Sequence, residues 1–427
     1  MKHFFIILFF VARVGFAEVR ANAMEYFSSK APERLLEQEA EIQLLTWNIL
    51  GLPNEQVAVR PWEERIDRIA ERILSIDAEI VLLQECFEPG LSLGLKDRLE
   101  KVYPHIYLHL KDDEVPLPSG LALFSKLPIA NFQFFPHPNL LDTERNSRMG
   151  TIEFLLLDAF RLPIAHIAAS HFQGSSNCEW RVGLTEEGER LSYAEVREQQ
   201  ANRILSLSSP CKIPHYVCGD LNVDRRSREY DHSSLNEENC KHLMNAMDWK
   251  MKMQGTNTNF WKHEKGIAKL YPELTKQQAL ELALQYERFY VEKLKPALIN
   301  GVSNKPLSHF DPSYFSQMEN ELNLHSEDQR TWEYFKMAAT EAVAKEKELW
   351  KMNQNQGDAP LVTIGKVIEV RALPIEESLD YVLGLGELSI ISKIEILEGY
   401  DHSSIENTLS DHHFLLAKIR VARERSL

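Results

Sequence analysis

The segment that most constrains the fold is the apolar run from Tyr216 to Val223, which reads YVCGDLNV. It predicts a buried strand that ends by presenting Asp220 and Asn222. Side chains two residues apart on a strand point to the same side. A carboxylate and a carboxamide held together in this way can bind a hard cation, a phosphate oxygen or an attacking water. Taken alone, the segment favours a simpler interpretation, an Asx turn after a strand.

Strand and helix patterns alternate along the first third of the chain, which indicates a layered α/β fold. A strand from Glu41 to Asn48 precedes a helix that begins at Trp62 and ends at Asp77, and a second strand runs from Glu79 to Leu83. Apolar residues recur at helical spacing in the helix, and Arg65 belongs to the charged set expected to face solvent. The other expected core elements are strands at 120–125, 151–156, 163–170, 216–220, 362–364, 366–370, 379–383 and 413–419 and a helix at about 193–207.

Long helical patterns dominate the segment from 261 to 365. Thr275 to Gln278 reads as a capping box in front of a helix that Pro296 stops, and a second helix is expected at about 326–352. We interpret 261–365 as a helical insertion in a catalytic domain formed by 24–260 and 366–427. Its aromatic residues favour packing between two helices over a lid or a bilayer-facing surface. They are Tyr286, Phe289, Tyr290, Trp332, Tyr334, Phe335 and Trp350.

The amino-terminal residues predict export from the cytoplasm. An apolar run from Phe4 to Phe10 is followed by small residues at Ala21 to Ala23, the pattern of a secretory signal peptide over 1–23. A membrane anchor is the weaker alternative, because Arg13 interrupts the run before it could span a bilayer. No later segment of the mature chain is apolar enough to cross one. We therefore expect a secreted or periplasmic protein.

The charge and the cysteines are consistent with this expectation. A formal net charge of −15 argues against a stable nucleic-acid partner or nonspecific attraction to anionic lipid. It does not exclude chemistry on a phosphodiester, because a bound divalent cation supplies local positive charge. Five cysteines fit an exported protein with one or two disulfides, although Cys86 and Cys218 are expected to be buried apolar residues.

Polar side chains stand at six ends of the expected strands. They are Asn48, Glu85, His171, Asp220 with Asn222, Asp380, and Asp411 with His412. Any one of them is more often structural than catalytic. As a set, they combine hard oxygen ligands suited to Mg²⁺ with an imidazole flanked by acids, which is the arrangement of a general base. No cysteine pair or tight histidine cluster indicates zinc.

The order of these motifs resembles the endonuclease/exonuclease/phosphatase (DNase I-like) superfamily. The matching segments are TWNILGLP (46–53), VLLQECF (81–87), GLALFSKLPI (120–129), SRMGTIEF (147–154), SHFQ (170–173), CGDLNV (218–223), SLDYVL (378–383) and SDHHFL (410–415). The match covers nearly all of the expected mature chain outside the insertion. It implies a four-layer α/β/β/α sandwich with the active site at one sheet edge.

The resemblance also implies a role for each strand-end residue. Asn48 and Glu85 would hold a divalent ion, Mg²⁺ with Mn²⁺ as the alternative. His171 would bind a phosphate oxygen, and His412 would activate the attacking water. The remaining positions would support them: Asp220 and Asn222 would position the water and the phosphate, Asp411 would be a metal or water ligand, and Asp380 would orient a histidine.

Within the superfamily, the motifs are most similar to the neutral sphingomyelinases, which hydrolyse sphingomyelin to ceramide and phosphocholine. Glu377 to Tyr381 stands where inositol 5-phosphatases usually have Pro-x-Trp-Cys-Asp-Arg, and Leu50 stands where repair nucleases have an acid. Met149 replaces a lysine common in sphingomyelinases, so Arg148 is the expected substrate-binding residue.

The sequence thus predicts a phosphodiesterase that acts on a phospholipid at a membrane surface. A nuclease, a phosphoinositide phosphatase and a catalytically inactive binding module on the same scaffold are the alternatives. The oligomeric state is not predicted.

Overall fold

The computed structural model describes a core that includes every predicted site residue. The described residues are 24–37, 39–53, 61–112, 114–174, 182–185, 190–206, 213–223, 233–235, 257–258, 267–289, 315, 319, 322, 324, 328–352, 376–377, 379–386, 388–399 and 408–422. The predicted signal peptide, the expected strands at 362–364 and 366–370, and both boundaries of the predicted insertion lie outside these residues.

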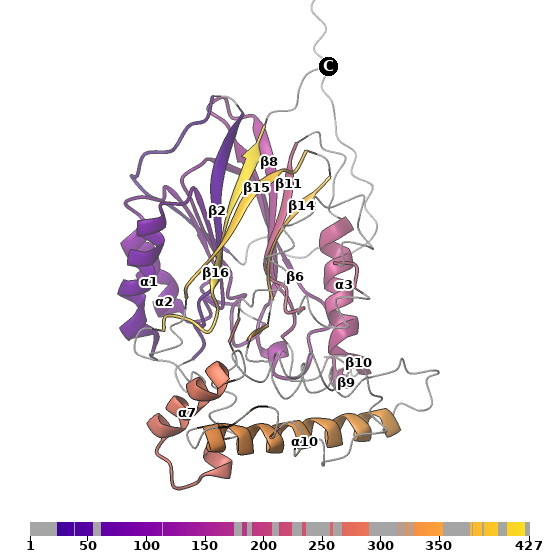
Figure 1. The fold of residues 1–427 in the computed structure, drawn as a ribbon. Coiled ribbons are helices and arrows are strands. Elements are labelled where there is room, and N and C mark those ends of the chain that lie inside the picture. Colours follow the sequence, from indigo (N-terminus) through magenta and orange to yellow (C-terminus); the bar gives the residue numbers. More distant parts are fainter. Residues whose placement is uncertain are drawn as a thin grey trace, which may run out of the picture.

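A seven-stranded sheet forms one half of the core. Its strand order is β1-β4-β5-β3-β2-β16-β15, and β2 pairs parallel with β3 and antiparallel with β16. The strands are β1 (Glu25–Ser28), β4 (His105–Leu108), β5 (Ala122–Ser125), β3 (Ile80–Gln84), β2 (Ala40–Asn48), β16 (Phe414–Val421) and β15 (Ile391–Leu397). Helices α1 (Trp62–Ile76) and α2 (Pro89–Leu99) cover its outer face (Figure 1).

A five-stranded sheet in the order β14-β11-β8-β7-β6 forms the other half. Its strands are β14 (Asp380–Leu385), β11 (His215–Asp220), β8 (Pro163–His171), β7 (Gly150–Leu157) and β6 (Ile129–Pro136). Helix α3 (Tyr193–Ser206) lies on its outer face, and the two sheets stack face to face (Figure 1). The predicted four-layer α/β/β/α sandwich is therefore confirmed.

Three apolar clusters fill the spaces between the four layers. Phe154 and Tyr216 lie in the cluster between the two sheets, Trp47 in the cluster beneath α1 and α2, and Val217 in the cluster beneath α3. Adjacent residues on β11 thus pack on opposite sides of their sheet, as the period of a strand requires. This alternation fixes which side chains of each strand reach the space between the sheets.

Two short ribbons and a 3-10 helix lie outside the two main sheets. The ribbons pair β9 (Val182–Leu184) with β10 (Arg190–Ser192) and β12 (Asn257–Thr258) with β13 (Glu376–Glu377). The 3-10 helix η2 (Asp142–Asn146) precedes β7.

Helix α1 contains the clearest departure from its predicted pattern. Its bounds agree with the prediction, and Asp77 caps it in the left-handed conformation at φ 60°. Arg65, however, is 1% exposed and not solvent-facing. Its guanidinium donates to three backbone carbonyls, those of Ile49, Leu50 and Leu409. Helical periodicity missed this position because the carbonyls come from loops distant in sequence.

Helices α7 (Lys276–Phe289) and α10 (Gln329–Met352) belong to the predicted insertion. The capping box is present, since Thr275 N donates to Gln278 Oε1 at 2.9 Å and Gln278 N donates to Thr275 Oγ1 at 3.3 Å. Five of the aromatic residues named above are buried, and Tyr286 of α7 packs edge-on against Tyr334 of α10 with their ring centroids 4.8 Å apart. Packing between the two helices is confirmed for this pair. Tyr290 lies outside the described residues, and the side chain of Trp350 is not described.

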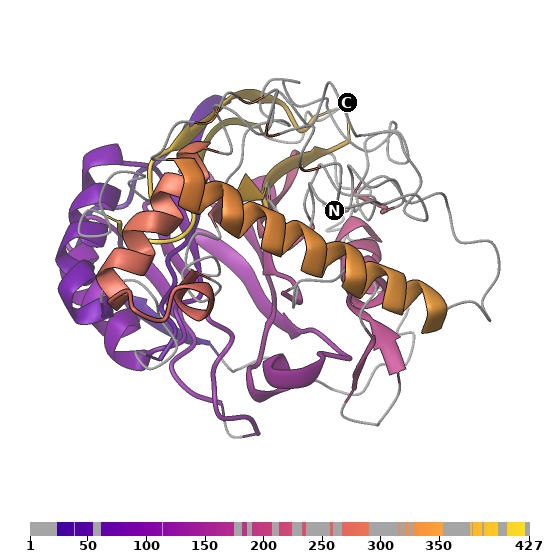
Figure 2. The same ribbon diagram turned by 60° about the horizontal axis from the view of Figure 1, so that its bottom comes forward.

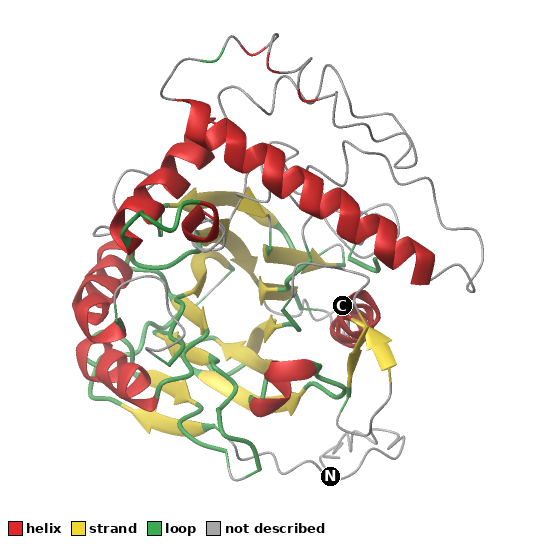
Figure 3. Cartoon of the chain, turned by 90° about the horizontal axis from the view of Figure 1, so that it is seen from below, coloured by secondary structure: helices red, strands yellow, loops and turns green. Residues whose placement is uncertain are grey.

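Both insertion helices lie at one end of the sandwich. Figures 1 and 2 show them beyond the end of the sandwich at which β16 begins. Figure 3 shows α10 crossing that end from the side of α1 and α2 toward α3. Among the described residues, no helix combines the length and apolarity needed to cross a membrane. Cys86 and Cys218 are buried free thiols, as predicted, whereas the other cysteines lie outside the described residues.

The strand β11 requires glycine at position 219. Gly219 has a φ of 127° and pairs with Ser170 of β8, and a Cβ atom there would overlap the backbone oxygen of Ser170. We expect Gly219→Ala to lower the free energy of unfolding by about 4 kcal/mol or more, because two central strands must separate.

Denaturant unfolding followed by circular dichroism measures this loss. Gly386→Ala is the matched control, since Gly386 also has a positive φ of 77° but has open space around it. That variant should lose only about 1 kcal/mol. Equal losses in the two variants would contradict the proposed close approach.

Candidate active site

The predicted strand-end residues converge at one end of the sandwich. Asn48 ends β2, Asp220 ends β11 and His171 ends β8, while Asp380 begins β14. His412 lies two residues before β16. Because β2 runs antiparallel to β16, the last residue of one strand lies near the first residue of the other. This end of the core is the one beside α7 and α10 (Figure 1).

The side chain of Asn48 joins the two halves of the site. Its Nδ2 donates to Glu85 Oε1 at 2.8 Å and to Asp220 Oδ2 at 3.0 Å. Its Oδ1 accepts from the backbone N–H of Leu50 at 3.1 Å, which fixes the orientation of the amide. Asn48 therefore holds two carboxylates together in this structure and turns its oxygen away from them. The role of Asn48 as a metal ligand stays a prediction. In that role the amide would have to rotate so that its Oδ1 faces the carboxylates.

Glu85 and Asp220 are the carboxylates that Asn48 brings together. Burial and the nearby charge of Asp411 raise the pKa of Glu85 to about 8. Burial, with a smaller contribution from Asp380, raises the pKa of Asp220 to about 7. It is energetically unfavourable for both carboxylates to be ionised at once, because they share one amide donor and are largely shielded from water. A cation bound between them would stabilise the ionised pair.

His412 and Asp380 form a buried dyad. Nδ1 of His412 lies 2.9 Å from Asp380 Oδ2, so Nε2 points toward the site and lies 3.7 Å from Asp220 Oδ2. Burial alone would lower the pKa of His412, but the carboxylates of Asp380 and Asp220 hold it well above its usual value. The predicted contact between Asp380 and an active-site histidine is present. An acid on one ring nitrogen fixes the orientation of the other.

His171 also lies beside the two carboxylates. Its Nε2 is 3.9 Å from Glu85 Oε1 and 3.7 Å from Asp220 Oδ2. Burial and the charge of His412 lower its pKa to about 3, so the ring is neutral. Asn222, at φ 52°, donates from Nδ2 to Phe172 O at 3.0 Å. This bond ties the ends of β8 and β11 together, which places His171 beside Asp220.

Asp411 and Arg148 relate to this arrangement in different ways. Asp411 is buried, its charge acts on both Glu85 and His412, and Ser410 Oγ donates to its Oδ1 at 3.5 Å. Arg148 is ion-paired with Glu114 at 2.5 Å and Asp112 at 3.4 Å. The structure therefore does not bring Arg148 to the carboxylates, and substrate binding by its guanidinium would require these pairs to open.

Two residues that sequence reasoning missed support the site. Ser410 Oγ donates to Asn48 O at 2.6 Å and accepts from the backbone N–H of His412 at 3.1 Å, so it joins β2 to the loop before β16. Both oxygens of Glu144 accept from the backbone N–H of Gly174, at 3.0 and 2.9 Å. Ser410 lies within the SDHH motif and could have been included with it. Glu144 carries no comparable sequence signal.

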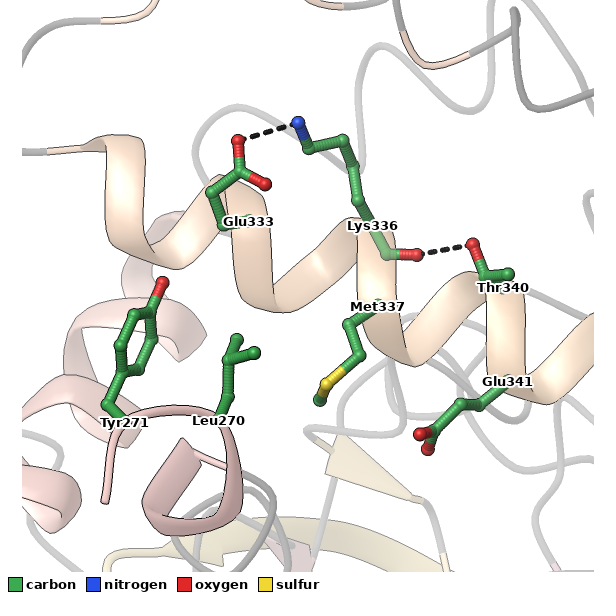
Figure 4. Close-up of a pocket in the computed structure, with 7 residues that line it drawn as sticks. All are labelled: Leu270, Tyr271, Glu333, Lys336, Met337, Thr340 and Glu341. Carbon is green, nitrogen blue, oxygen red and sulfur yellow. Dashed lines mark hydrogen bonds and ion pairs between the residues drawn. The ribbon is translucent and has the colours of Figure 1, made fainter.

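A separate pocket lies within the insertion. Its volume is about 540 Å³, and it lies between α10 and residues 267–271. Figure 4 shows Leu270, Tyr271 and Met337 facing one another while the Glu333–Lys336 ion pair lies at its margin. None of the predicted site residues lines it. The residues described above therefore form a site at the end of the sandwich that is separate from this pocket.

The sequence matches a family model that fits this arrangement. Residues 45–268, more than half of the chain, match the model of the endonuclease/exonuclease/phosphatase family. The chain belongs to this family. Members of the family are metal-dependent hydrolases that act on phosphodiester bonds. The superfamily resemblance of the motifs is thereby confirmed.

Individual relatives within the family are distant. Human nocturnin is 26% identical over 275 residues, which is 56% of this chain and 60% of nocturnin. The chain thus matches less than two thirds of that relative's length. Among solved structures, sphingomyelinase C from Streptomyces griseocarneus is similar at 15% identity and a TM-score of 0.47, over 89% of this chain and 99% of its own. A magnesium-bound mutant of beta toxin from Staphylococcus aureus is similar at 14% identity and a TM-score of 0.47, over 89% and 99%.

The residues present fit a divalent cation. Glu85 Oε2 is buried and accepts no hydrogen bond, although buried carboxylate oxygens are normally satisfied. Glu85, His171 and Asp220 each place one ligand atom within 4.8 Å of the others. Oxygen atoms from two carboxylates with one imidazole suit several divalent ions. The structure therefore supports a divalent-cation site at Glu85, His171 and Asp220.

Proposed function

We propose that this protein is an exported, Mg²⁺-dependent phosphodiesterase that hydrolyses sphingomyelin to ceramide and phosphocholine. The hydrolase part of the proposal rests on one observation: Glu85, His171, Asp220 and His412 converge at one end of the sandwich. When bound, the cation would supply charge neutralisation at the phosphate. Export through residues 1–23 predicts a mature protein that begins near Met24, which N-terminal sequencing of the exported protein tests.

The chain's own residues account for the movement of the proton. A water between His412 Nε2 and Asp220 can give its proton to the imidazole when that ring is neutral, and Asp380 anchors the ring through Nδ1. A cation held by the carboxylates would favour the neutral ring, because it would offset the carboxylate charge that raises the pKa of His412. The neutral ring of His171, which lies beside the same carboxylate, can donate a hydrogen bond to a phosphate oxygen. Displacement at phosphorus depends chiefly on such positioning and charge neutralisation.

An apolar cluster beside the catalytic residues supports a lipid substrate. Phe87, Leu140 and Met149 form its buried part, and Leu52 and Leu117 pack on it half-buried. The ring of Phe87 is centred 6.3 Å from that of His171. Gly51 N also donates to the backbone oxygen of Glu85 at 2.8 Å, so the residue before Leu52 lies against the backbone that carries Glu85. An apolar surface at this place suits a phosphodiester with an apolar group next to the phosphate.

The apolar cluster predicts a substrate-dependent loss of activity. We expect Leu52→Ser and Leu117→Ser each to lower kcat/KM on sphingomyelin vesicles by about 10-fold, the value of one apolar contact in a binding site. Hydrolysis of the water-soluble diester bis(p-nitrophenyl) phosphate should change little. Leu162→Ser is the matched control, because Leu162 is exposed and precedes the opposite end of β8. Equal losses on both substrates would contradict an apolar contact.

The second candidate is a nuclease or phosphoinositide phosphatase of the same family. It is favoured by the similarity to nocturnin and by Met149, which stands where sphingomyelinases have a lysine. A substrate panel separates the candidates: phosphocholine release from sphingomyelin, cleavage of DNA and RNA, and inorganic phosphate release from phosphoinositides, each with Mg²⁺ and with chelator. Phosphocholine as the dominant product supports the proposal, and its absence beside another product would replace it.

A further inference from the structure

Two histidines and a glutamate outside the active site lie together on the five-stranded sheet. His166 of β8 pairs directly with His215 of β11, and their rings lie side by side with centroids 4.3 Å apart. Glu153 stands on the neighbouring strand β7, and its Oε2 is 3.6 Å from His166 Nε2. All three share the sheet face beneath α3, because Glu153 lies opposite Ala168 and each histidine precedes Ala168 or Val217, which pack there, by two residues.

This cluster is separate from the active site, although it lies on the same strands. His215 and Asp220 are the first and last residues of β11, and they pair with His166 and His171 of β8. About 17 Å of strand therefore separates the cluster from the catalytic residues. Asp220 also lies on the other face of the sheet, since it is two residues beyond Cys218, which packs between the two sheets.

Polar atoms of the cluster are buried without partners. Both ring nitrogens of His215 and Oε1 of Glu153 lack a hydrogen bond, and the two residues are 5% and 9% exposed. Buried polar atoms are normally satisfied, and each that is not costs free energy. An ion pair between His166 and Glu153 would account for their contact, but it would leave both nitrogens of His215 unexplained. Burial and the neighbouring His166 lower the pKa of His215 to about 3, so the ring is neutral, which is the form that binds a metal ion.

The spacing of two of the ligand atoms suits a tetrahedral cation. Bonds of about 2.0–2.1 Å place two ligands of such an ion roughly 3.4 Å apart, close to the 3.6 Å between His166 Nε2 and Glu153 Oε2. The three residues do not place one ligand atom each within 4.8 Å of the others in this structure, so binding requires the His215 ring to turn. A histidine ring has two broad orientations about its Cβ–Cγ bond, and the turn breaks no hydrogen bond of this ring.

We propose that Glu153, His166 and His215 form a second metal site, which takes Zn²⁺ rather than Mg²⁺. Two imidazoles with one carboxylate are a donor set of zinc sites, whereas Mg²⁺ requires oxygen ligands. The ion would link β7, β8 and β11 and would supply partners for the buried atoms. The side chains of His166 and Glu153 are 14% and 12% exposed, so the site opens to solvent at their end. Because the ion would bind only the folded arrangement, it should stabilise the protein.

Thermal unfolding of the purified full chain in saturating Mg²⁺, with and without Zn²⁺, tests the site without any substrate. At a Zn²⁺ concentration about 100-fold above Kd, the rise in Tm of the wild type should exceed that of His215→Phe by about 4 °C. Zinc bound at the catalytic carboxylates adds equally to both. Without Zn²⁺, the Tm of His215→Phe should equal or exceed that of the wild type, because phenylalanine removes two unpaired polar atoms from the core. Metal analysis after dialysis should find one Zn²⁺ per chain fewer in the variant.

A second variant and a control complete the test. Glu153→Gln removes the charged ligand and should weaken Zn²⁺ binding by about 100-fold, so it decides the matter if His215→Phe does not fold. His105→Phe is the matched control, because His105 also lies beside a glutamate, Glu33 at 3.0 Å, but has Tyr26 instead of a second imidazole as its ring partner. Its rise in Tm and its zinc content should match the wild type. Equal rises and equal zinc contents in the wild type, His215→Phe and Glu153→Gln would overturn the inference, as would a wild type that Zn²⁺ does not stabilise.

Discussion

Replacement of His412 by alanine is expected to lower kcat by about 10²- to 10⁴-fold, the usual contribution of a positioned general base. The imidazole is held by Asp380 at 2.9 Å and directs its other nitrogen toward Asp220. Alanine leaves no group at that position to accept the proton of the attacking water. KM should change much less than kcat, because the residue is 3% exposed and has little surface to offer the substrate.

Steady-state kinetics on whichever substrate of the panel the wild type hydrolyses measures this effect, and thermal unfolding shows whether the variant is folded. His105→Ala is the matched control: His105 is a half-buried histidine paired with Glu33 at 3.0 Å on β4. It should keep kcat within a factor of about two. A folded His412→Ala protein that retains more than about a tenth of the activity would show that the dyad is not the base.

Glu85→Gln is expected to raise the Mg²⁺ concentration required for half-maximal activity by about 100-fold or more. Loss of a group that merely supports a metal ligand typically costs 10- to 100-fold. Loss of a ligand carboxylate should cost at least as much. The metal-free variant should also be more stable than the wild type. A neutral amide avoids both the burial of a charged carboxylate and its repulsion with Asp411, which together raise the pKa of Glu85 to about 8.

These opposite effects distinguish a metal ligand from a structural carboxylate. Glu79→Gln makes the same chemical change at another buried glutamate, whose Oε2 accepts from Gln43 N at 2.6 Å and which immediately precedes β3. That control should lose stability and keep the Mg²⁺ requirement of the wild type. If Glu85→Gln lost stability in chelator and kept its Mg²⁺ requirement, Glu85 would be structural.

The main strands and the place of the site could be predicted because both depend on local patterns. Apolar runs such as Glu79 to Leu83 give buried strands, and the polar residues that follow them meet where neighbouring strands end. His412 and Asp380 are far apart in sequence, yet each could be assigned from its own strand end. Because strand ends converge in a layered fold, the two residues could then be expected to lie in one site.

Other features depend on contacts that no local pattern records. Arg65 has the spacing of a solvent-facing residue, but carbonyls from distant loops draw it inward. The orientation of the Asn48 amide depends on the Leu50 N–H group and on two carboxylates, and the residue type alone does not record these contacts. The edge strand β15 escaped prediction although its pairing with β16 is extensive.

The most direct test of the account is the rate of phosphocholine release from sphingomyelin vesicles by the purified protein, measured with Mg²⁺ and with chelator. The account predicts rapid release with Mg²⁺, none above background with chelator, and a rate for His412→Ala that is lower by about 10²-fold or more. Release that is equal with and without Mg²⁺, or equal in wild type and His412→Ala, would contradict a metal-assisted reaction at the site formed by Glu85, Asp220 and His412.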